Sequence, residues 1–124
     1  MVDKRLFFFD KDVIPWTGEN KLHDFYKTLL TLRSTNPALR AADKNVRTYR
    51  LETTFNPGVF AFLRKNKERE VLVILNLSSG KQQIKIIGKV AAGEFKNVFT
   101  GTELKMSSEK IFELSEWGYE VYEK

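Results

Sequence analysis

The stretch Val-Leu-Val-Ile-Leu at residues 71–75 decides the fold, because it is the longest uninterrupted apolar run in the chain and is rich in branched side chains. A strand that is apolar at every position is typical of the centre of a sheet with both faces covered. The run is far shorter than the roughly 18 apolar residues of a membrane span, so we expect no membrane partner. The rest of the sequence should therefore supply neighbouring strands and a cover for each face.

Further segments rich in β-branched and aromatic residues recur after residue 44, and Gly, Pro, Asn and Ser separate them. Ile84 and Ile86 flank Lys85, an alternation typical of a half-exposed strand. No helical pattern of useful length follows, which argues against a parallel sheet with crossover helices. The prediction is a mainly β chain of about eight antiparallel strands after one helix. The predicted strands cover residues 46–52, 58–65, 70–77, 82–87, 94–99, 103–106, 109–114 and 118–123.

An amphipathic helix is predicted over residues 20–34, where apolar side chains recur at three- and four-residue steps. Thr17 or Asn20 is expected to cap its start, and Arg33 suits the negative end of the helix dipole. Pro37 is expected to stop it, since proline cannot donate and restricts the residue before it. The apolar stripe consists of Leu22, Phe25, Tyr26, Leu29 and Leu30.

Composition excludes several classes of protein. The 124 residues contain no Cys and one His, which rules out a disulfide framework, a thiolate nucleophile and a Cys-ligated zinc. His23 alone builds no metal site, so we expect neither a metal nor another cofactor. The net charge is +5, but both signs are mixed along the chain, and the densest basic cluster, residues 64–70, contains Glu68 and Glu70. A nucleic-acid partner is therefore not expected, because its footprint needs cations gathered on one face.

Few residues suggest catalysis. Asp10 and Asp12 would point to the same side of an extended segment, and paired carboxylates can act on a glycosidic bond. A solvated loop, in which Asp12 fixes a turn, is the interpretation that we favour. His23 lies off the helical stripe and is expected to be a surface or interface residue. The chain has neither a Gly-x-Ser-x-Gly elbow nor a phosphate-binding glycine loop, so we expect no catalytic residue.

Aromatic residues are the remaining candidates for binding: the chain has ten Phe, four Tyr and two Trp. Exposed Trp and Tyr are common platforms for sugar rings, and Trp16, Trp117 and Tyr49 are the candidates for carbohydrate binding. Packing at a sheet edge or against a neighbouring domain is the alternative, and the sequence leaves it open. Phenylalanines of the predicted strands are expected in the core: Phe60, Phe62, Phe95, Phe99 and Phe112.

Two long motifs resemble the alpha-amylase family of glycoside hydrolases, family 13. Residues 6–16 (LFFFDKDVIPW) are similar to the loop after the last strand of that family's catalytic barrel, and residues 25–39 (FYKTLLTLRSTNPAL) to its final helix. Residues 59–64, 71–78, 93–101 and 114–122 resemble strands of its C-terminal domain. The resemblance implies an antiparallel Greek-key β-sandwich over residues 41–124, preceded by a remnant of the barrel over residues 1–40.

The resemblance also implies a function. The family's catalytic carboxylates lie on earlier barrel strands whose motifs do not occur here, so Asp10 and Asp12 gain no catalytic role. We expect a non-catalytic domain that packs on and stabilises its own barrel through the helical stripe, in a parent enzyme that cleaves alpha-1,4-glucans. Without the barrel, the helix is expected to fold back on the sandwich or to pack against a second copy. A carbohydrate-binding module for alpha-glucan is the alternative.

The cellular compartment stays open. The apolar stretch 6–9 is too short for the core of a secretion signal and is followed by charged residues. The parent enzyme is therefore compatible with a secreted, periplasmic or cytoplasmic location.

Overall fold

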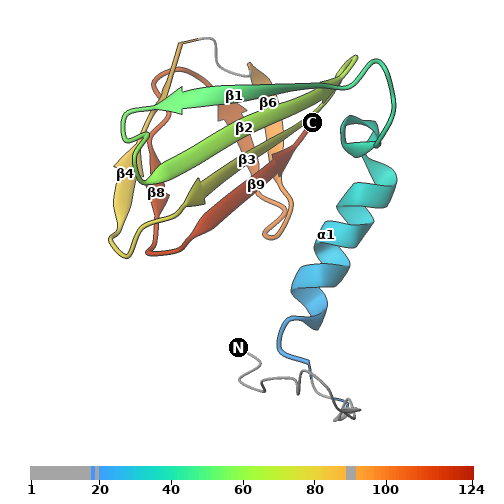
Figure 1. The fold of residues 1–124 in the computed structure, drawn as a ribbon, viewed down its shortest axis with the longest axis horizontal. Coiled ribbons are helices and arrows are strands. Elements are labelled where there is room, and N and C mark those ends of the chain that lie inside the picture. Colours follow the sequence, from blue (N-terminus) through green and yellow to red (C-terminus); the bar gives the residue numbers. More distant parts are fainter. Residues whose placement is uncertain (1–17, 19, 89–91) are drawn as a thin grey trace, which may run out of the picture.

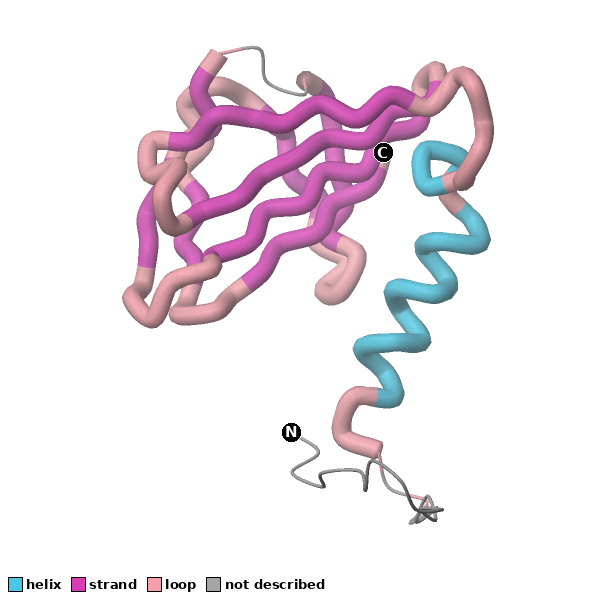
Figure 2. Tube along the Cα trace, in the orientation of Figure 1, coloured by secondary structure: helices cyan, strands magenta, loops and turns pink. Residues whose placement is uncertain are grey.

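Nine antiparallel strands follow one α-helix in the computed structural model, which describes residues 18, 20–88 and 92–124 (Figures 1 and 2). The helix α1 (His23–Thr35) continues into a short 3₁₀ turn, η1 (Pro37–Leu39). The strands are β1 (Arg47–Thr53), β2 (Val59–Asn66), β3 (Arg69–Asn76), β4 (Gln82–Ile84), β5 (Ile86–Ile87), β6 (Gly93–Asn97), β7 (Glu103–Met106), β8 (Phe112–Leu114) and β9 (Tyr119–Glu123).

The strands form a β-sandwich, as predicted. A curled seven-stranded sheet has the order β5-β1-β2-β3-β9-β6-β7, and β4 pairs with β8 in a second, two-stranded sheet. Strands distant in sequence are neighbours at β3–β9 and β1–β5, which are the crossovers of a Greek-key arrangement. Ile86 of β5 and Met106 of β7, the two edge strands of this sheet, belong to the same buried core.

The strand β3 is the centre of the large sheet, which confirms the prediction from its apolar run. Leu72 and Ile74 on its inner face are fully buried in the sandwich core. Val71 and Val73 point to the outer face, where they pack with Leu32 of α1. Because successive side chains of a strand point to opposite faces, a run without polar residues is needed only where both faces are covered.

The predicted strand 82–87 is two strands. Residues Gln82–Ile84 pair with β8, whereas Ile86–Ile87 pair with β1. Between them, the backbone of Lys85 donates to the Thr54 hydroxyl at 3.1 Å and accepts from the Thr54 N–H at 3.0 Å. Ile84 and Ile86 are both buried in the same core, so the alternation of polar and apolar residues continues across the break. At Lys85 the chain changes the strand to which it is hydrogen-bonded, from β8 to β1, while its apolar side chains continue to point into the core. Hydrophobic periodicity reports only the second of these features.

The helix differs from the prediction at its start. It begins at His23, preceded by Leu22, and no side chain caps it; Asn20 contributes only its carbonyl oxygen, to the N–H of His23 at 2.9 Å. The prediction that Asn20 is a side-chain cap is therefore wrong, and Thr17 lies outside the described residues. At the other end Arg33 lies in the last turn and Pro37 begins the 3₁₀ turn, as expected. No helix among the described residues is long and apolar enough to cross a bilayer.

The junction between helix and sandwich is buried and hydrogen-bonded. The side chains of Asn36 and Ala38 are inaccessible to solvent. The Asn36 amide donates to Glu123 Oε2 at 3.2 Å. From the β2–β3 hairpin, the Asn66 amide donates to the Pro37 carbonyl at 3.1 Å and to Asp43 Oδ2 at 2.9 Å. These bonds attach the end of α1 to both β2 and β9.

Candidate functional site

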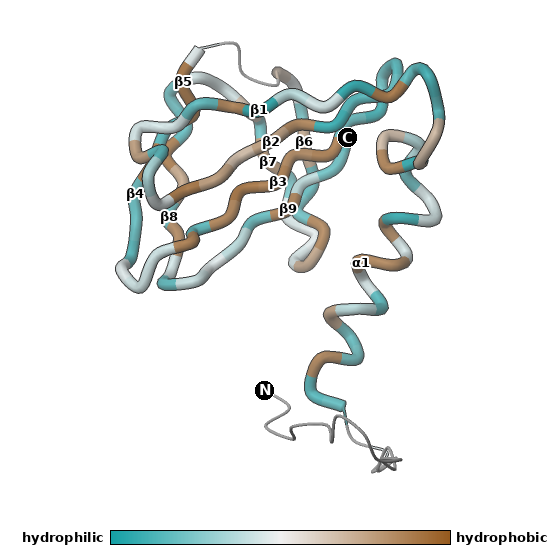
Figure 3. The backbone as a smooth tube through the Cα atoms, viewed as in Figure 1, coloured by the Kyte–Doolittle hydropathy of each residue, from teal (hydrophilic) through white to brown (hydrophobic). Residues whose placement is uncertain are grey.

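The outer face of the large sheet carries a second, smaller apolar cluster, which α1 covers only in part. Figure 3 shows apolar residues recurring along α1 and along the strands beside it. Leu32, Ala38, Val71 and Val121 form the buried centre of this cluster. Beside it lies an apolar cleft of about 390 Å³ between helix and sheet. We call this the outer-face cleft; its apolar lining includes Phe25, Leu29, Leu32, Leu39, Phe62, Val73, Leu75, Leu77, Phe99, Trp117 and Tyr119.

Three aromatic rings hold the first half of α1 against the sandwich. Phe25 stacks on Phe99 with ring centroids 5.5 Å apart and planes 6° apart. Tyr119 meets both rings edge-on, at 5.3 Å from Phe25 and 5.2 Å from Phe99. Offset stacking and edge-to-face contacts are the favourable geometries of aromatic pairs. The helix therefore packs on the sandwich through Phe25, whereas the prediction that folding back would bury the whole stripe is not met, because Leu22, Tyr26 and Leu30 stay exposed.

The predicted helical stripe is divided between two adjoining flanks of the helix. Phe25 and Leu29 line the outer-face cleft, half-buried. Leu22, Tyr26 and Leu30 are exposed, Leu30 at 66%. A wide apolar arc on a helical wheel does not show where one contact surface ends and another begins, so the helical pattern predicts a single face.

Exposed apolar side chains continue beyond the helix. Phe60 was expected in the core but is exposed, because it points to the outer face whereas its neighbours Val59 and Ala61 point inward. Its ring lies 5.7 Å from the guanidinium of Arg50. Phe62 and Phe99 are half-buried, and Phe95 and Phe112 are in the core as predicted. We call the exposed outer-face side chains the apolar strip: Phe60, Leu77, Trp117 and Tyr119.

The sugar-platform candidates are not brought together. Trp117 is 64% exposed in the turn before β9, with a left-handed φ of 54°, and lines the outer-face cleft. Tyr49 lies opposite Leu63 in the β1–β2 register and therefore on the inner side of the sheet. Trp16, like Asp10 and Asp12, lies outside the described residues.

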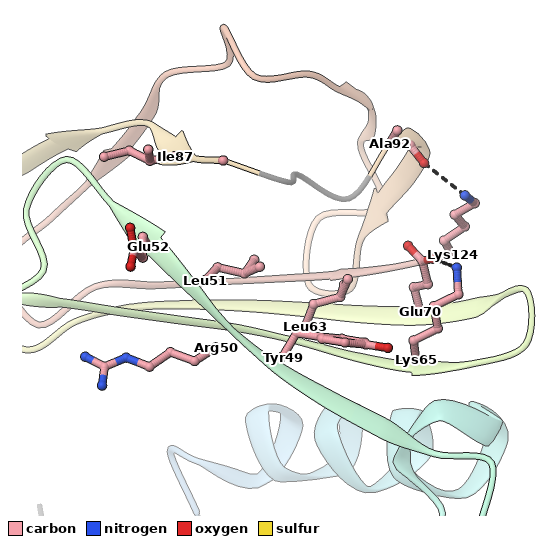
Figure 4. Close-up of a pocket in the computed structure, with 11 residues that line it drawn as sticks. Tyr49, Arg50, Leu51, Glu52, Leu63, Lys65, Glu70, Ile87, Ala92 and Lys124 are labelled. Carbon is pink, nitrogen blue, oxygen red and sulfur yellow. Dashed lines mark hydrogen bonds and ion pairs between the residues drawn. The ribbon is translucent and has the colours of Figure 1, made fainter.

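Tyr49 lines a cavity of about 670 Å³, which we call the Tyr49 cavity (Figure 4). Lys65 Nζ pairs with Glu70 Oε1 at 2.7 Å, and this hydrogen bond, followed by the charge of Glu70, raises the pKa of the Lys65 ammonium. Lys124 Nζ donates to the carbonyl of Ala92 at 3.0 Å. The residues that line this cavity are distant in sequence and are brought together only by the pairing of β1, β2, β3 and β9. For this reason the sequence pattern did not reveal the cavity.

Side chains able to hold a metal do not gather in the described part of the chain. No group of three or more His, Asp or Glu residues is arranged there as a metal site. His23 is an exposed residue of the first helical turn, as its position off the stripe predicted.

The comparisons with known proteins agree with this fold. The sequence model of the maltogenic amylase C-terminal domain matches residues 49–121. The chain belongs to this family. No curated protein sequence matches the chain significantly.

Two solved structures resemble this maltogenic amylase C-terminal domain. A noncanonic maltogenic alpha-amylase from Thermotoga neapolitana aligns over 98% of the domain's chain and 30% of its own, with a TM-score of 0.75 and 16% identity. An Anoxybacillus alpha-amylase aligns over 85% and 22%, with a TM-score of 0.63 and 22% identity. At these identities the likeness shows a shared fold. The chain thus spans less than a third of either enzyme, and the resemblance seen in the sequence is confirmed.

Proposed function

We propose that this domain is non-catalytic and that it packs on and stabilises the catalytic barrel of a parent enzyme that cleaves alpha-1,4-glucans. Residues 1–40 would belong to the barrel and residues 41–124 to the sandwich. The observation that carries the proposal is the exposed flank of α1, which presents Leu22, Tyr26 and Leu30 four residues apart. The opposite side of the same apolar arc already packs on the sheet.

The energetic argument concerns what this flank costs when it is exposed. Burying one large apolar side chain contributes about 1.5–3 kcal/mol. Side chains at four-residue steps form a ridge that fits the groove of a neighbouring helix. A helix with apolar residues on two adjoining flanks is suited to lie between two layers, here the sheet and the proposed barrel. The apolar strip on the sheet extends the same surface.

The test compares two forms of the protein. In a polypeptide that includes the coding sequence upstream of Met1, the double variant Tyr26→Ala, Leu30→Ala should lower the unfolding temperature by several degrees, because it removes buried contacts. In the 124-residue chain, at a concentration where it is monomeric, the same variant should have little effect. The matched control is Lys27→Ala, Thr31→Ala, on the polar side of the helix. Equal effects in both polypeptides, or an upstream sequence without a barrel, would contradict the proposal.

A second function, binding of alpha-glucan, is favoured by the exposure of Trp117 and Tyr49. Trp16 stays a candidate on sequence grounds. Retention of the 124-residue chain on a starch affinity gel, lost when the responsible aromatic is replaced by Ala, tests this function. Free migration through the gel would contradict it.

A further inference from the structure

The outer-face cleft has the size and the lining of a site for an elongated apolar molecule. Its volume of about 390 Å³ lies within the range of about 300–1,000 Å³ that is usual for ligand pockets. Its lining along the central strand runs from Val71 to Leu77, which corresponds to about 20 Å of extended chain. Trp117 lies at the Leu77 end, since its N–H donates to the carbonyl of Ser78 at 3.1 Å. All lining residues belong to the described part of the chain.

Arg64, at the opposite end, is the charged residue of this lining. It pairs with Val71 in the β2–β3 register and is half-buried. Glu123 lies beside Val71 on β9, but it is already paired with Arg69 at 3.6 Å and accepts from Asn36. Among the described residues, no carboxylate lies within ion-pair distance of Arg64, and its Nε is buried without an acceptor. Because an uncompensated cation in apolar surroundings is costly, the terminal nitrogens of this guanidinium are suited to bind an anion.

The hydrogen-bonding capacity of the cleft argues against a peptide as its occupant. The strands β2 and β3 each have a partner strand on both sides, so their backbone groups are already paired. The amide of Asn76, which also lines the cleft, donates to the carbonyls of Gly80 and Ser115. A peptide would bring further N–H and C=O groups into the cleft, where few partners are left for them. A hydrocarbon chain brings no such groups.

We propose that the outer-face cleft binds an aliphatic carboxylate such as a fatty acid, with the hydrocarbon chain between α1 and the sheet and the carboxylate on the terminal nitrogens of Arg64. A carboxylate fits better than a phosphate, because one planar guanidinium matches its two oxygens and its single charge. The far end of the hydrocarbon chain lies against the ring of Trp117. This site goes beyond the proposed packing function and requires neither a barrel nor the exposed flank of α1.

The experiment is a fluorescence titration of the 124-residue chain with dodecanoate, at a protein concentration where the chain is monomeric. The background variant Trp16→Phe leaves Trp117 as the single tryptophan. A saturable blue shift of its emission is expected, because the bound hydrocarbon covers a ring that is 64% exposed. Methyl dodecanoate has the same chain without the charge and should bind about tenfold more weakly, the loss typical of one hydrogen bond to a charged group. Acetate, which lacks the chain, should not displace dodecanoate.

Two arginine variants in the same background test the position of the carboxylate. Arg64→Gln should weaken dodecanoate binding about tenfold and leave methyl dodecanoate binding unchanged. The matched control is Arg50→Gln, since Arg50 also lies on the outer face, over the ring of Phe60, but does not line the cleft. It should bind dodecanoate as tightly as the background variant. Circular dichroism verifies that each variant is folded, and if Arg64→Gln unfolds, the comparison of dodecanoate with its methyl ester still tests the proposal without that substitution.

Several results would overturn the inference. Absence of a saturable response, or equal affinity for dodecanoate and methyl dodecanoate, would refute a carboxylate site. Equal weakening by Arg64→Gln and Arg50→Gln would indicate general attraction of an anion to a basic protein. Displacement of dodecanoate by maltotriose would assign the cleft to carbohydrate. Since all titrations use the chain without a barrel, the packing function can fail while this site stands.

Discussion

Asn76 shows how much a single buried side chain contributes to this fold. Its Nδ2 donates to the carbonyls of Gly80 and Ser115 at 2.8 and 2.7 Å, and its Oδ1 accepts from the N–H of Ser78 at 3.1 Å. The amide therefore connects the end of β3 with two turns, those before β4 and before β9. A buried amide with several partners is typical of a structural residue and not of a binding group.

Replacing Asn76 by Ala should lower the free energy of unfolding by about 2–4 kcal/mol, because the side chain is buried and all of its hydrogen bonds to the two turns are lost. Urea denaturation measures the loss. Gln83→Ala is the control: its amide bonds only to the exposed Glu113, so a change below about 0.5 kcal/mol is expected. If Asn76→Ala and Gln83→Ala lowered the free energy of unfolding by similar amounts, the hydrogen bonds of Asn76 would contribute no special stability.

Tyr122 gives a pH dependence. Burial and then the charge of Glu120 raise the pKa of its hydroxyl from 10.0 to about 12. Above pH 10 the unfolded chain releases this proton while the folded chain retains it, so the stability that the group contributes is complete below about pH 10 and is lost by about pH 12. Across this window the free energy of unfolding of Tyr122→Phe should therefore fall by about 2 kcal/mol less than that of the unmodified chain. Urea denaturation between pH 9 and 12 measures both slopes, and parallel curves would contradict the assignment.

At this scale the sequence predicts less than at any other. Periodicity placed Phe95 and Phe112 correctly in the core, but it did not identify Phe60 as an outer-face residue. The face on which a side chain lies depends on the register with neighbouring strands, and both faces of β2 carry apolar residues. The Tyr49 cavity was likewise invisible, because it depends on pairing between four strands.

The element scale is dominated by the helix α1, whose two apolar flanks have different surroundings. Leu32 is buried against Val71 and Val121, and Phe25 contacts Phe99 and Tyr119. The exposed flank makes no such contacts among the described residues. Attachment of the helix to the sheet should therefore depend on the first flank and on the buried junction at Asn36, and not on the exposed flank.

Substitution of Leu32 by Ala should cost about 2–4 kcal/mol and should increase amide hydrogen exchange in α1 more than in β3. Leu30→Ala is the matched control, since Leu30 is one of the most exposed leucines of the same helix. Its exchange pattern should match that of the unmodified chain. Equal protection of α1 in Leu32→Ala would mean that the aromatic contacts of Phe25 hold the helix without it.

Elements were largely predictable from the sequence. Gly, Pro and Asn mark the turns, and the alternation of apolar residues marks the strands, so most strand positions agree within two residues. The two exceptions have the same cause: a hydrophobic pattern indicates which residues are buried, but not which groups the backbone hydrogen-bonds to. The switch at Lys85 from the two-stranded sheet to the edge of the large sheet, and the uncapped start of α1 at His23, are both hydrogen-bonding features.

At the scale of the whole molecule, the exposed flank and the apolar strip make the 124-residue chain prone to associate. Burial of Leu22, Tyr26 and Leu30 against a second copy would remove the same cost that a barrel would remove. We expect concentration-dependent dimers in sedimentation experiments. Tyr26→Lys with Leu30→Lys should shift the equilibrium to monomers, whereas Lys105→Glu, an exposed residue of β7, should not. A chain that stays monomeric at all concentrations would contradict this expectation.

The buried junction at Asn36 and Ala38 has a mechanical consequence. Because Asn66 and Glu123 hold this turn from two strands, the direction in which α1 leaves the sandwich is set by the sandwich and not by a tether. A second protein whose last helix continues directly into α1 would therefore be held at a fixed angle to the sandwich. The helix can therefore serve as a rigid coupling in fusion proteins, where the length of α1 would set both distance and rotation.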